Sequence, residues 1–296
     1  MGYMRRPKII KTLKLKGPVT GVTVYKEEIF ITRHESTTID AFNSTTFKRS
    51  QPISTSENKR KFPILRMIYK TQKSNGLQDI TSCWKKGFIY VGSWQDCIIH
   101  RIDTVSRSVC GSWEVKNGDP TTLSVTKYGN LLVSCASDGK VLEYTSEGEL
   151  VHEINFACNG EGPLHAVHLT NERFAACHGR RDAVRVNDGV TITDKYGNVI
   201  PEVKPLVLSQ SCHLTIDSNN NVLIAARGRS KLTLWNPIKG TQRVLISLDQ
   251  EIEVPTRIHL DESTGQLLML FQSETLKIYQ VKSAESNAAN NDCEDD

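Results

Sequence analysis

The sequence predicts an all-β fold, a six-bladed β-propeller whose blades are four-stranded antiparallel sheets. Three observations lead to this prediction. One order of short apolar runs and turns recurs six times along the 296 residues. The repeats begin 43 to 58 residues apart, which is close to the length of a propeller blade. A strand-like segment, 8–15, precedes the first repeat without a partner, while the last repeat lacks its fourth strand.

The third repeat shows the pattern most clearly. Four apolar runs alternate with short turns, two of which are glycine-containing hairpin signals. The turns are Lys-Tyr-Gly-Asn, Ser-Asp-Gly and Ser-Glu-Gly-Glu. This order predicts an antiparallel meander with strands at 121–126, 131–136, 140–145 and 150–154.

The other five repeats follow the same order. Each begins with an inner strand, and these strands open near Pro18, Gly76, Asp119, Pro163, Gln210 and Pro255. The second strands are predicted at 29–34, 88–93, 131–136, 173–178, 222–227 and 267–272. The third strands are predicted at 38–43, 98–103, 141–146, 183–188, 232–237 and 276–281.

The ends of the chain complete the organisation. We expect the N-terminal strand to fill the fourth position of the last blade, which closes the ring and protects the sheet edges. The predicted domain is therefore a single propeller over 1–282 with a basic insertion, 49–75, between blades 1 and 2. Residues 283–296 form a polar, acidic tail that we expect to be disordered.

The composition is that of an ordinary globular protein, with 38% apolar residues, 24% charged residues and a formal charge of +4. No run approaches the ~18 consecutive apolar residues of a membrane-spanning helix, and the start has no apolar signal segment. We therefore expect a cytoplasmic protein, with the nucleus as the alternative. The eight cysteines form no C-x-x-C pair, so reduced, packed thiols are expected.

A family resemblance rests on the third repeat. Its Pro120-x-x-Leu-x-Val opening, the Gly-Asn turn and the segment LLVSCASDGKVLEYTSEGE resemble the NHL repeat of six-bladed propellers, in particular the C-terminal NHL domain of tripartite-motif (TRIM-NHL) proteins. The resemblance covers about 5–282 and is best in 119–155 and 210–248. The RING and B-box modules of tripartite-motif proteins are missing, so ubiquitin-ligase activity is not implied.

The loops between second and third strands suggest where a ligand binds. They share one face with the mouth of the central channel, and several carry arginines, which bind phosphates through planar forks. An aromatic side chain beside arginines suits single-stranded RNA, and the resemblance also implies RNA on this face. The predicted RNA-binding rim consists of Arg33, His34, Trp94, Arg180, Arg181, Arg227, Arg229 and Arg257.

Two other readings of the basic residues stay open. A protein or peptide partner held by the same rim would make the chain an interaction scaffold. The segment 49–73 has seven basic residues against one glutamate. Such a segment is suited to binding phosphates, to serving as a nuclear-import signal or to forming a solvated linker.

An enzyme is the remote alternative. Aligning the inner strands places Asp79, Thr122, His165, His213 and Arg257 at one register around the axis, with Thr20 or Gly21 in blade 1. Histidines and an aspartate are zinc ligands, and a metal-dependent lyase would resemble the amidating lyases that share this repeat. The ring lacks a third histidine and holds an arginine. We therefore expect no catalytic residue, metal, cofactor or small-molecule substrate.

Overall fold

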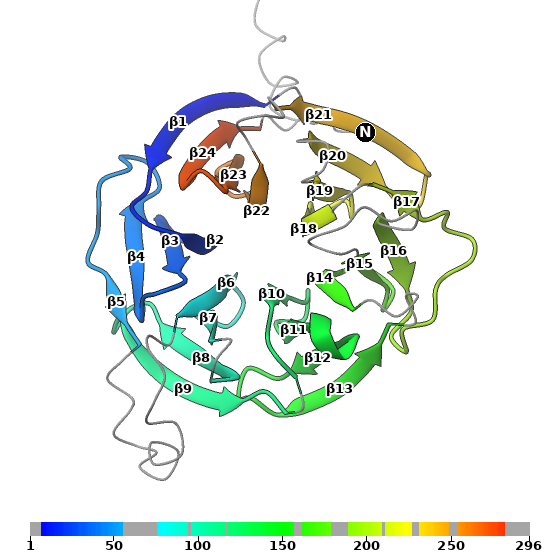
Figure 1. The fold of residues 1–296 in the computed structure, drawn as a ribbon, viewed down its shortest axis with the longest axis horizontal. Coiled ribbons are helices and arrows are strands. Elements are labelled where there is room, and N and C mark those ends of the chain that lie inside the picture. Colours follow the sequence, from blue (N-terminus) through cyan, green and yellow to red (C-terminus); the bar gives the residue numbers. More distant parts are fainter. Residues whose placement is uncertain are drawn as a thin grey trace, which may run out of the picture.

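The protein is a closed ring of six four-stranded antiparallel sheets, as the computed structural model shows (Figure 1). The structure describes residues 7–55, 76–93, 96–116, 118–156, 162–178, 189–208, 211–226, 231–248 and 254–281. These ranges contain one short 3-10 turn, Ala136–Asp138, besides the strands. Within them no helix is long and apolar enough to cross a membrane.

Blades 1 to 3 each run outward from the axis in chain order. Blade 1 holds β2 (Val19–Tyr25), β3 (Glu28–Arg33), β4 (Thr38–Asn43) and β5 (Ile53–Ser54). Blade 2 holds β6 (Leu77–Cys83), β7 (Phe88–Ser93), β8 (Ile98–Asp103) and β9 (Ser108–Glu114). Blade 3 holds β10 (Thr122–Val125), β11 (Leu131–Cys135), β12 (Lys140–Tyr144) and β13 (Leu150–Asn155).

Blades 4 to 6 continue the ring, and the last one takes its outer strand from the start of the chain. Blade 4 holds β14 (Pro163–His168), β15 (Phe174–His178), β16 (Gly189–Thr193) and β17 (Leu206–Val207). Blade 5 holds β18 (Ser211–Ile216), β19 (Val222–Ala226), β20 (Lys231–Asn236) and β21 (Thr241–Ser247). Blade 6 holds β22 (Pro255–Asp261), β23 (Gln266–Phe271), β24 (Thr275–Gln280) and β1 (Lys8–Lys14).

The ring closure is confirmed. Strand β1 pairs antiparallel with β24, from Lys8 opposite Gln280 to Lys14 opposite Thr275. In Figure 1 the two ends of the colour scale, blue β1 and orange-red β24, lie side by side in blade 6. The chain therefore seals its own sheet, and blade 6 is not left with an unpaired edge at β24.

The predicted third strand of blade 4 is wrong. The structure pairs β15 with Gly189–Thr193, with Cys177 opposite Val190, whereas we expected 183–188, a segment outside the described residues. Both segments alternate apolar and polar residues, so a period of two cannot choose between them. The first part of the predicted basic insertion is also structured, because Ile53 pairs with Ile39 as the outer strand of blade 1.

The apolar core lies between the blades. Six clusters of buried side chains each join two neighbouring blades, and one of them joins blade 6 to blade 1 through Leu268, Leu270, Val22 and Ile31. Burial of these faces is the main source of stability. It places the second strand of every blade in the interior, so the axis, the outer strands and the loops at the two faces remain available for function.

Candidate functional site

The inner strands share a backbone irregularity that aims one side chain at the axis. In five blades the pairing of the inner strand with its neighbour shifts register near the start of the strand, as between Leu77 and Asp79. In such a bulge, two residues of the inner strand lie opposite one residue of the neighbouring strand, and the direction of the following side chain changes. The residues after the shift are Gly21, Asp79, His165, His213 and Arg257, and Thr122 takes the same place in blade 3.

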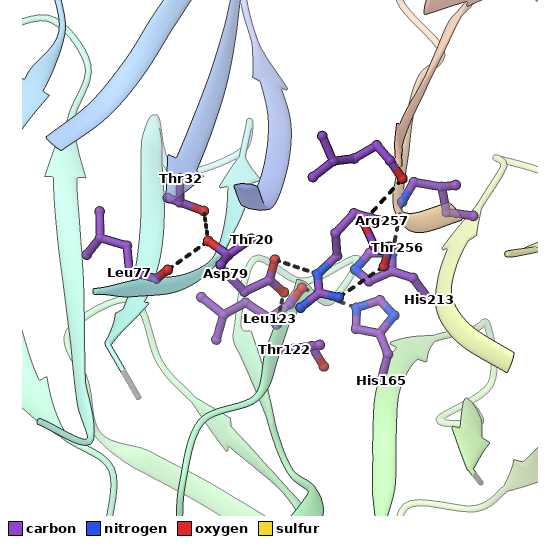
Figure 2. A network of polar contacts seen from close by, with 12 residues as sticks. Thr20, Thr32, Leu77, Asp79, Thr122, Leu123, His165, His213, Thr256 and Arg257 are labelled. Carbon is purple, nitrogen blue, oxygen red and sulfur yellow. Dashed lines mark hydrogen bonds and ion pairs between the residues drawn. The ribbon is translucent and has the colours of Figure 1, made fainter. Parts of the chain in front are cut away.

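The predicted axial alignment is thus confirmed, and Figure 2 shows the side chains of Asp79, His165, His213 and Arg257 gathered at the axis. An ion pair spans the axis from blade 2 to blade 6, because Arg257 Nε donates to Asp79 Oδ1 at 3.2 Å. Asp79 Oδ2 also accepts the Leu123 N–H of blade 3 at 2.9 Å. Burial raises the pKa of the Asp79 carboxyl, while the Arg257 guanidinium and backbone N–H donors oppose that shift.

The two axial histidines are stacked and neutral. Their ring centroids are 3.9 Å apart with a 14° angle between the planes. His165 Nδ1 accepts the Leu214 N–H at 3.1 Å, so the proton sits on Nε2, which donates to the Leu123 carbonyl at 3.2 Å. Burial lowers the pKa of His165 to about 3 and that of His213 well below its ordinary value. Both rings are therefore uncharged at neutral pH.

The axial polar groups join each blade to the next. Thr20 Oγ1 donates to Leu77 O of blade 2 at 2.7 Å, and Thr122 Oγ1 donates to Leu164 O of blade 4 at 2.6 Å. His213 Nδ1 accepts the Ile258 N–H of blade 6 at 3.4 Å. Together with the contacts of Asp79 and His165, these bonds run from blade 1 to blade 6. Because buried polar groups need partners, these axial side chains are satisfied by bonds between neighbouring blades and by the Arg257–Asp79 pair, which links blade 6 to blade 2.

A zinc site at the axis does not fit these residues. Both nitrogens of His165 are bonded to backbone groups, and a guanidinium rather than a third ligand faces the carboxylate of Asp79. Over the described ranges, no three His, Cys, Asp or Glu side chains gather as a metal site would require. The donor set is that of a structural hydrogen-bond network.

The predicted rim divides into described and undescribed residues. Arg33 forms an ion pair with Asp40 at 2.6 Å and also donates to the carbonyls of Lys16 and Gly17, leaving its side chain 13% exposed. His34 is exposed, whereas Arg257 lies in the axial network. Two of these three side chains, Arg33 and Arg257, are thus engaged by carboxylates of the fold. The remaining predicted residues, Trp94, Arg180, Arg181, Arg227 and Arg229, lie outside the described residues.

Sequence reasoning missed a group of exposed aromatic residues on the other face. Trp84, Tyr128 and Tyr196 are 78%, 58% and 70% exposed, and each has a lysine ammonium within 6 Å of its ring. A signal was present, because Lys-Tyr-Gly-Asn occurs twice, at 127–130 and 195–198. Taken as a turn signal alone, it does not reveal where the tyrosine points.

Comparisons with known proteins support the fold and nothing finer. No protein-family description matches the sequence, and no curated protein sequence is recognisably related to it. Virginiamycin B lyase from Staphylococcus aureus is similar in structure, with a TM-score of 0.62 and 10% identity over 92% of this chain and 99% of the lyase chain. Hydrazine synthase of Kuenenia stuttgartiensis has a TM-score of 0.61 and 13% identity over 88% of this chain and 75% of its own. At such identities the likeness is one of propeller architecture.

Proposed function

We propose that this propeller is a non-enzymatic binding module whose ligand is single-stranded RNA. The observation that carries the binding role is the axial network, in which the polar side chains of the channel are engaged in holding neighbouring blades together. A rigid ring of this kind presents variable loops at its two faces, and such loops are where scaffolds place their binding residues.

The arginines of the rim support RNA as the ligand. Arg180 and Arg181 follow the second strand of blade 4, and Arg227 and Arg229 follow that of blade 5. The loops that carry them are equivalent in neighbouring blades. Pairs of arginines repeated in this way offer planar donors to consecutive phosphates. The two described arginines of the predicted rim, Arg33 and Arg257, instead hold carboxylates of the fold, so we assign phosphate binding to the other four.

The test is binding of a randomised single-stranded RNA pool to the whole chain at low and at physiological salt. We expect enrichment of bound sequences and an affinity that falls steeply with salt. The variant Arg180→Glu/Arg227→Glu should weaken binding about tenfold or more and reduce the salt dependence.

A control variant with the same change in net charge is Lys48→Glu/Lys239→Glu, since both lysines are exposed in loops of the opposite face. It should bind as the wild type does. Absence of binding at low salt would overturn the RNA proposal. An equal loss in both variants would show a response to net charge rather than to a rim.

A protein partner is the second candidate function, and a specific observation favours it. Outer strands of the ring carry exposed aliphatic side chains, among them Ile9 and Ile10 on β1, Leu150 on β13 and Val244 on β21. Outer strands with apolar side chains are suited to pairing with an added strand. Loss of a bound partner protein on Ile9→Lys substitution, with RNA binding unchanged, would establish protein binding as a function separate from RNA binding.

A further inference from the structure

The face opposite the predicted rim carries a band of exposed aromatic and lysine side chains. It is formed by the turns that follow first strands in blades 2 and 3 and by the turn after the third strand of blade 4. Because all inner strands run in one direction and the sheets are antiparallel, these turns share a face. We define the aromatic–lysine band as Trp84, Lys85, Lys86, Lys127, Tyr128, Lys195 and Tyr196.

The band extends over the neighbouring blades 2, 3 and 4. A side chain at Gly129 would begin 3.4 Å from Lys86 carbons, so Lys86 lies against the turn that holds Tyr128. The Tyr128 ring packs at 5.5 Å from the ring of His168 in blade 4. On that same blade, Lys195 Nζ is 2.9 Å from Glu172.

The turns themselves do not require a lysine and a tyrosine. Four five-residue turns have one geometry: the first N–H donates to the last carbonyl at 2.8 to 3.0 Å, and the first side-chain oxygen accepts the N–H groups of the third and fifth residues. The turns are 126–130, 145–149, 194–198 and 217–221.

The central residues of these turns differ while the backbone does not. Lys127-Tyr128 and Lys195-Tyr196 fill two of them, whereas Ser146-Glu147 and Ser218-Asn219 fill the others. Because the fold accepts small or acidic side chains at the same place, an aromatic ring exposed to water there adds nothing that the turn needs. Exposed aromatic residues of this kind are typical of binding surfaces.

The band offers ammonium groups to an anionic ligand. Lys85, Lys86 and Lys127 have no carboxylate within 4 Å among the described residues. The carboxylates on the same side of blades 3 and 4 are engaged within the fold, because Glu147 pairs with Arg101, Glu172 pairs with Lys195 and Asp194 accepts N–H groups of its own turn. The three lysines therefore attract an anionic ligand to the band.

We propose that the aromatic–lysine band is a second RNA-binding surface, on which unpaired bases stack against Trp84, Tyr128 and Tyr196 while lysines neutralise the phosphates. This proposal rests on RNA being the ligand of the proposed function. Three exposed rings on neighbouring blades, each with a lysine beside it, offer stacking faces to bases and positive charge to phosphates. A protein partner would instead favour anchor residues clustered in one desolvated pocket.

The experiment measures binding of a short oligouridylate to the whole chain, by anisotropy of the labelled RNA and by quenching of tryptophan fluorescence. Replacing the three rings together, as Trp84→Ala/Tyr128→Ala/Tyr196→Ala, should weaken binding about a thousandfold, since each of the three stacked bases contributes about tenfold. The conservative set Trp84→Phe/Tyr128→Phe/Tyr196→Phe should keep binding near wild type. Ile238→Ala is the matched control, an exposed apolar residue of the same face outside the band.

Fluorescence separates the two surfaces. Trp84 belongs to the band and Trp94 to the predicted rim, so quenching that disappears in Trp84→Phe while anisotropy still reports binding places a base on the band. Quenching that persists in Trp84→Phe and disappears in Trp94→Phe would overturn the band. Absence of any RNA binding by the wild type would instead defeat the proposed function itself.

Two further ligands complete the test. Polyphosphate carries negative charge but no bases. If the protein bound polyphosphate as tightly as the oligouridylate, and the aromatic triple variant lost affinity for both to the same extent, base stacking would be overturned. Binding of a polyglutamate peptide in preference to RNA, with the same dependence on the three rings, would overturn RNA in favour of an acidic protein. If the aromatic triple variant bound RNA as tightly as the wild type, the band would be excluded as an RNA-binding surface and the rim would remain the proposed RNA site.

Discussion

The axis and the aromatic–lysine band are two polar regions with opposite physical character. At the axis, Asp79, His165 and His213 are 2%, 1% and 7% exposed, and each bonds to the backbone of the following blade. In the band, Trp84 and Tyr196 are largely exposed, and the turn that carries Tyr196 has the same hydrogen bonds as turns that carry other residues.

This difference separates residues that hold the structure from residues available to a ligand. Histidine, aspartate and arginine gathered at one point suggest catalysis, yet here their hydrogen-bonding capacity is directed into the ring. Aromatic side chains in hairpin turns attract less notice, yet they are the groups that the fold leaves open. If the axis is structural and the band is not, changes at the axis destabilise the ring and changes in the band do not.

Acidification should have the largest effect, because it attacks the axis and the neighbouring histidines at once. Burial lowers the pKa of His165 to about 3 and that of His168 to about 4, against ~6.5 in the unfolded chain. Between these values the unfolded state binds more protons, so the stabilisation is complete above pH 6.5 and is lost as the pH falls. Each histidine should lower the free energy of unfolding by about 1.4 kcal/mol per pH unit.

Urea titrations between pH 7.5 and pH 4.5 measure this slope. The variant His165→Gln lacks one titrating group, so its stability should depend less steeply on pH than that of the wild type. A urea midpoint of unfolding that stayed the same between pH 6.5 and pH 5 would contradict the conclusion that these histidines are neutral in the folded ring.

Breaking the axial ion pair should have the next largest effect. Asp79→Ala leaves the Arg257 guanidinium, 12% exposed, without its carboxylate and removes the acceptor of the Leu123 N–H. Loss of one partner of a buried ion pair costs about 3–5 kcal/mol, measurable by equilibrium denaturation. The double variant Asp79→Leu/Arg257→Met should recover much of that loss, and a single-variant effect under ~1 kcal/mol would show the pair to be dispensable.

Filling the space beside Asp79 should have an intermediate effect. Gly21→Ala would place a Cβ 2.7 Å from Asp79 Oδ1 and 2.8 Å from the backbone nitrogen of Ile80, and overpacking of this kind costs about 1–3 kcal/mol. Gly139→Ala is a useful comparison, because a Cβ there meets no atom within 4 Å but sits at a positive φ. A Gly21→Ala protein as stable as the wild type would show that blades 1 and 2 separate easily.

Removing the exposed rings should have the smallest effect on stability. Trp84→Ala and Tyr196→Ala take away groups that are mostly in water, and surface changes of this sort stay within about 0.5 kcal/mol of the wild type. Thermal unfolding measures the effect. A loss above ~1 kcal/mol would mean that the band supports the fold, and the comparison with the axis would then fail.

Much of the fold was predictable because its signals are local. The six inner strands, the turns between them and the pairing of 8–15 with the last repeat all follow from alternation, glycine positions and the repeat length. The third strand of blade 4 was missed because two adjacent segments alternate equally well, and only the pairing of Cys177 with Val190 decides between them. The axial register was also predictable, since it depends on the repeat alone.

The roles of the axial residues and of the exposed aromatic residues depend on the assembled ring. By itself the sequence determined the number of blades, the closing strand and which residues reach the axis, because periodicity and turn chemistry act over a few residues. Only the tertiary structure decided that Arg257 faces Asp79 and that Arg33 faces Asp40. It also decided that Trp84, Tyr128 and Tyr196 share one face. Contacts and exposure depend on neighbours brought together from distant parts of the chain, and a local pattern does not contain them.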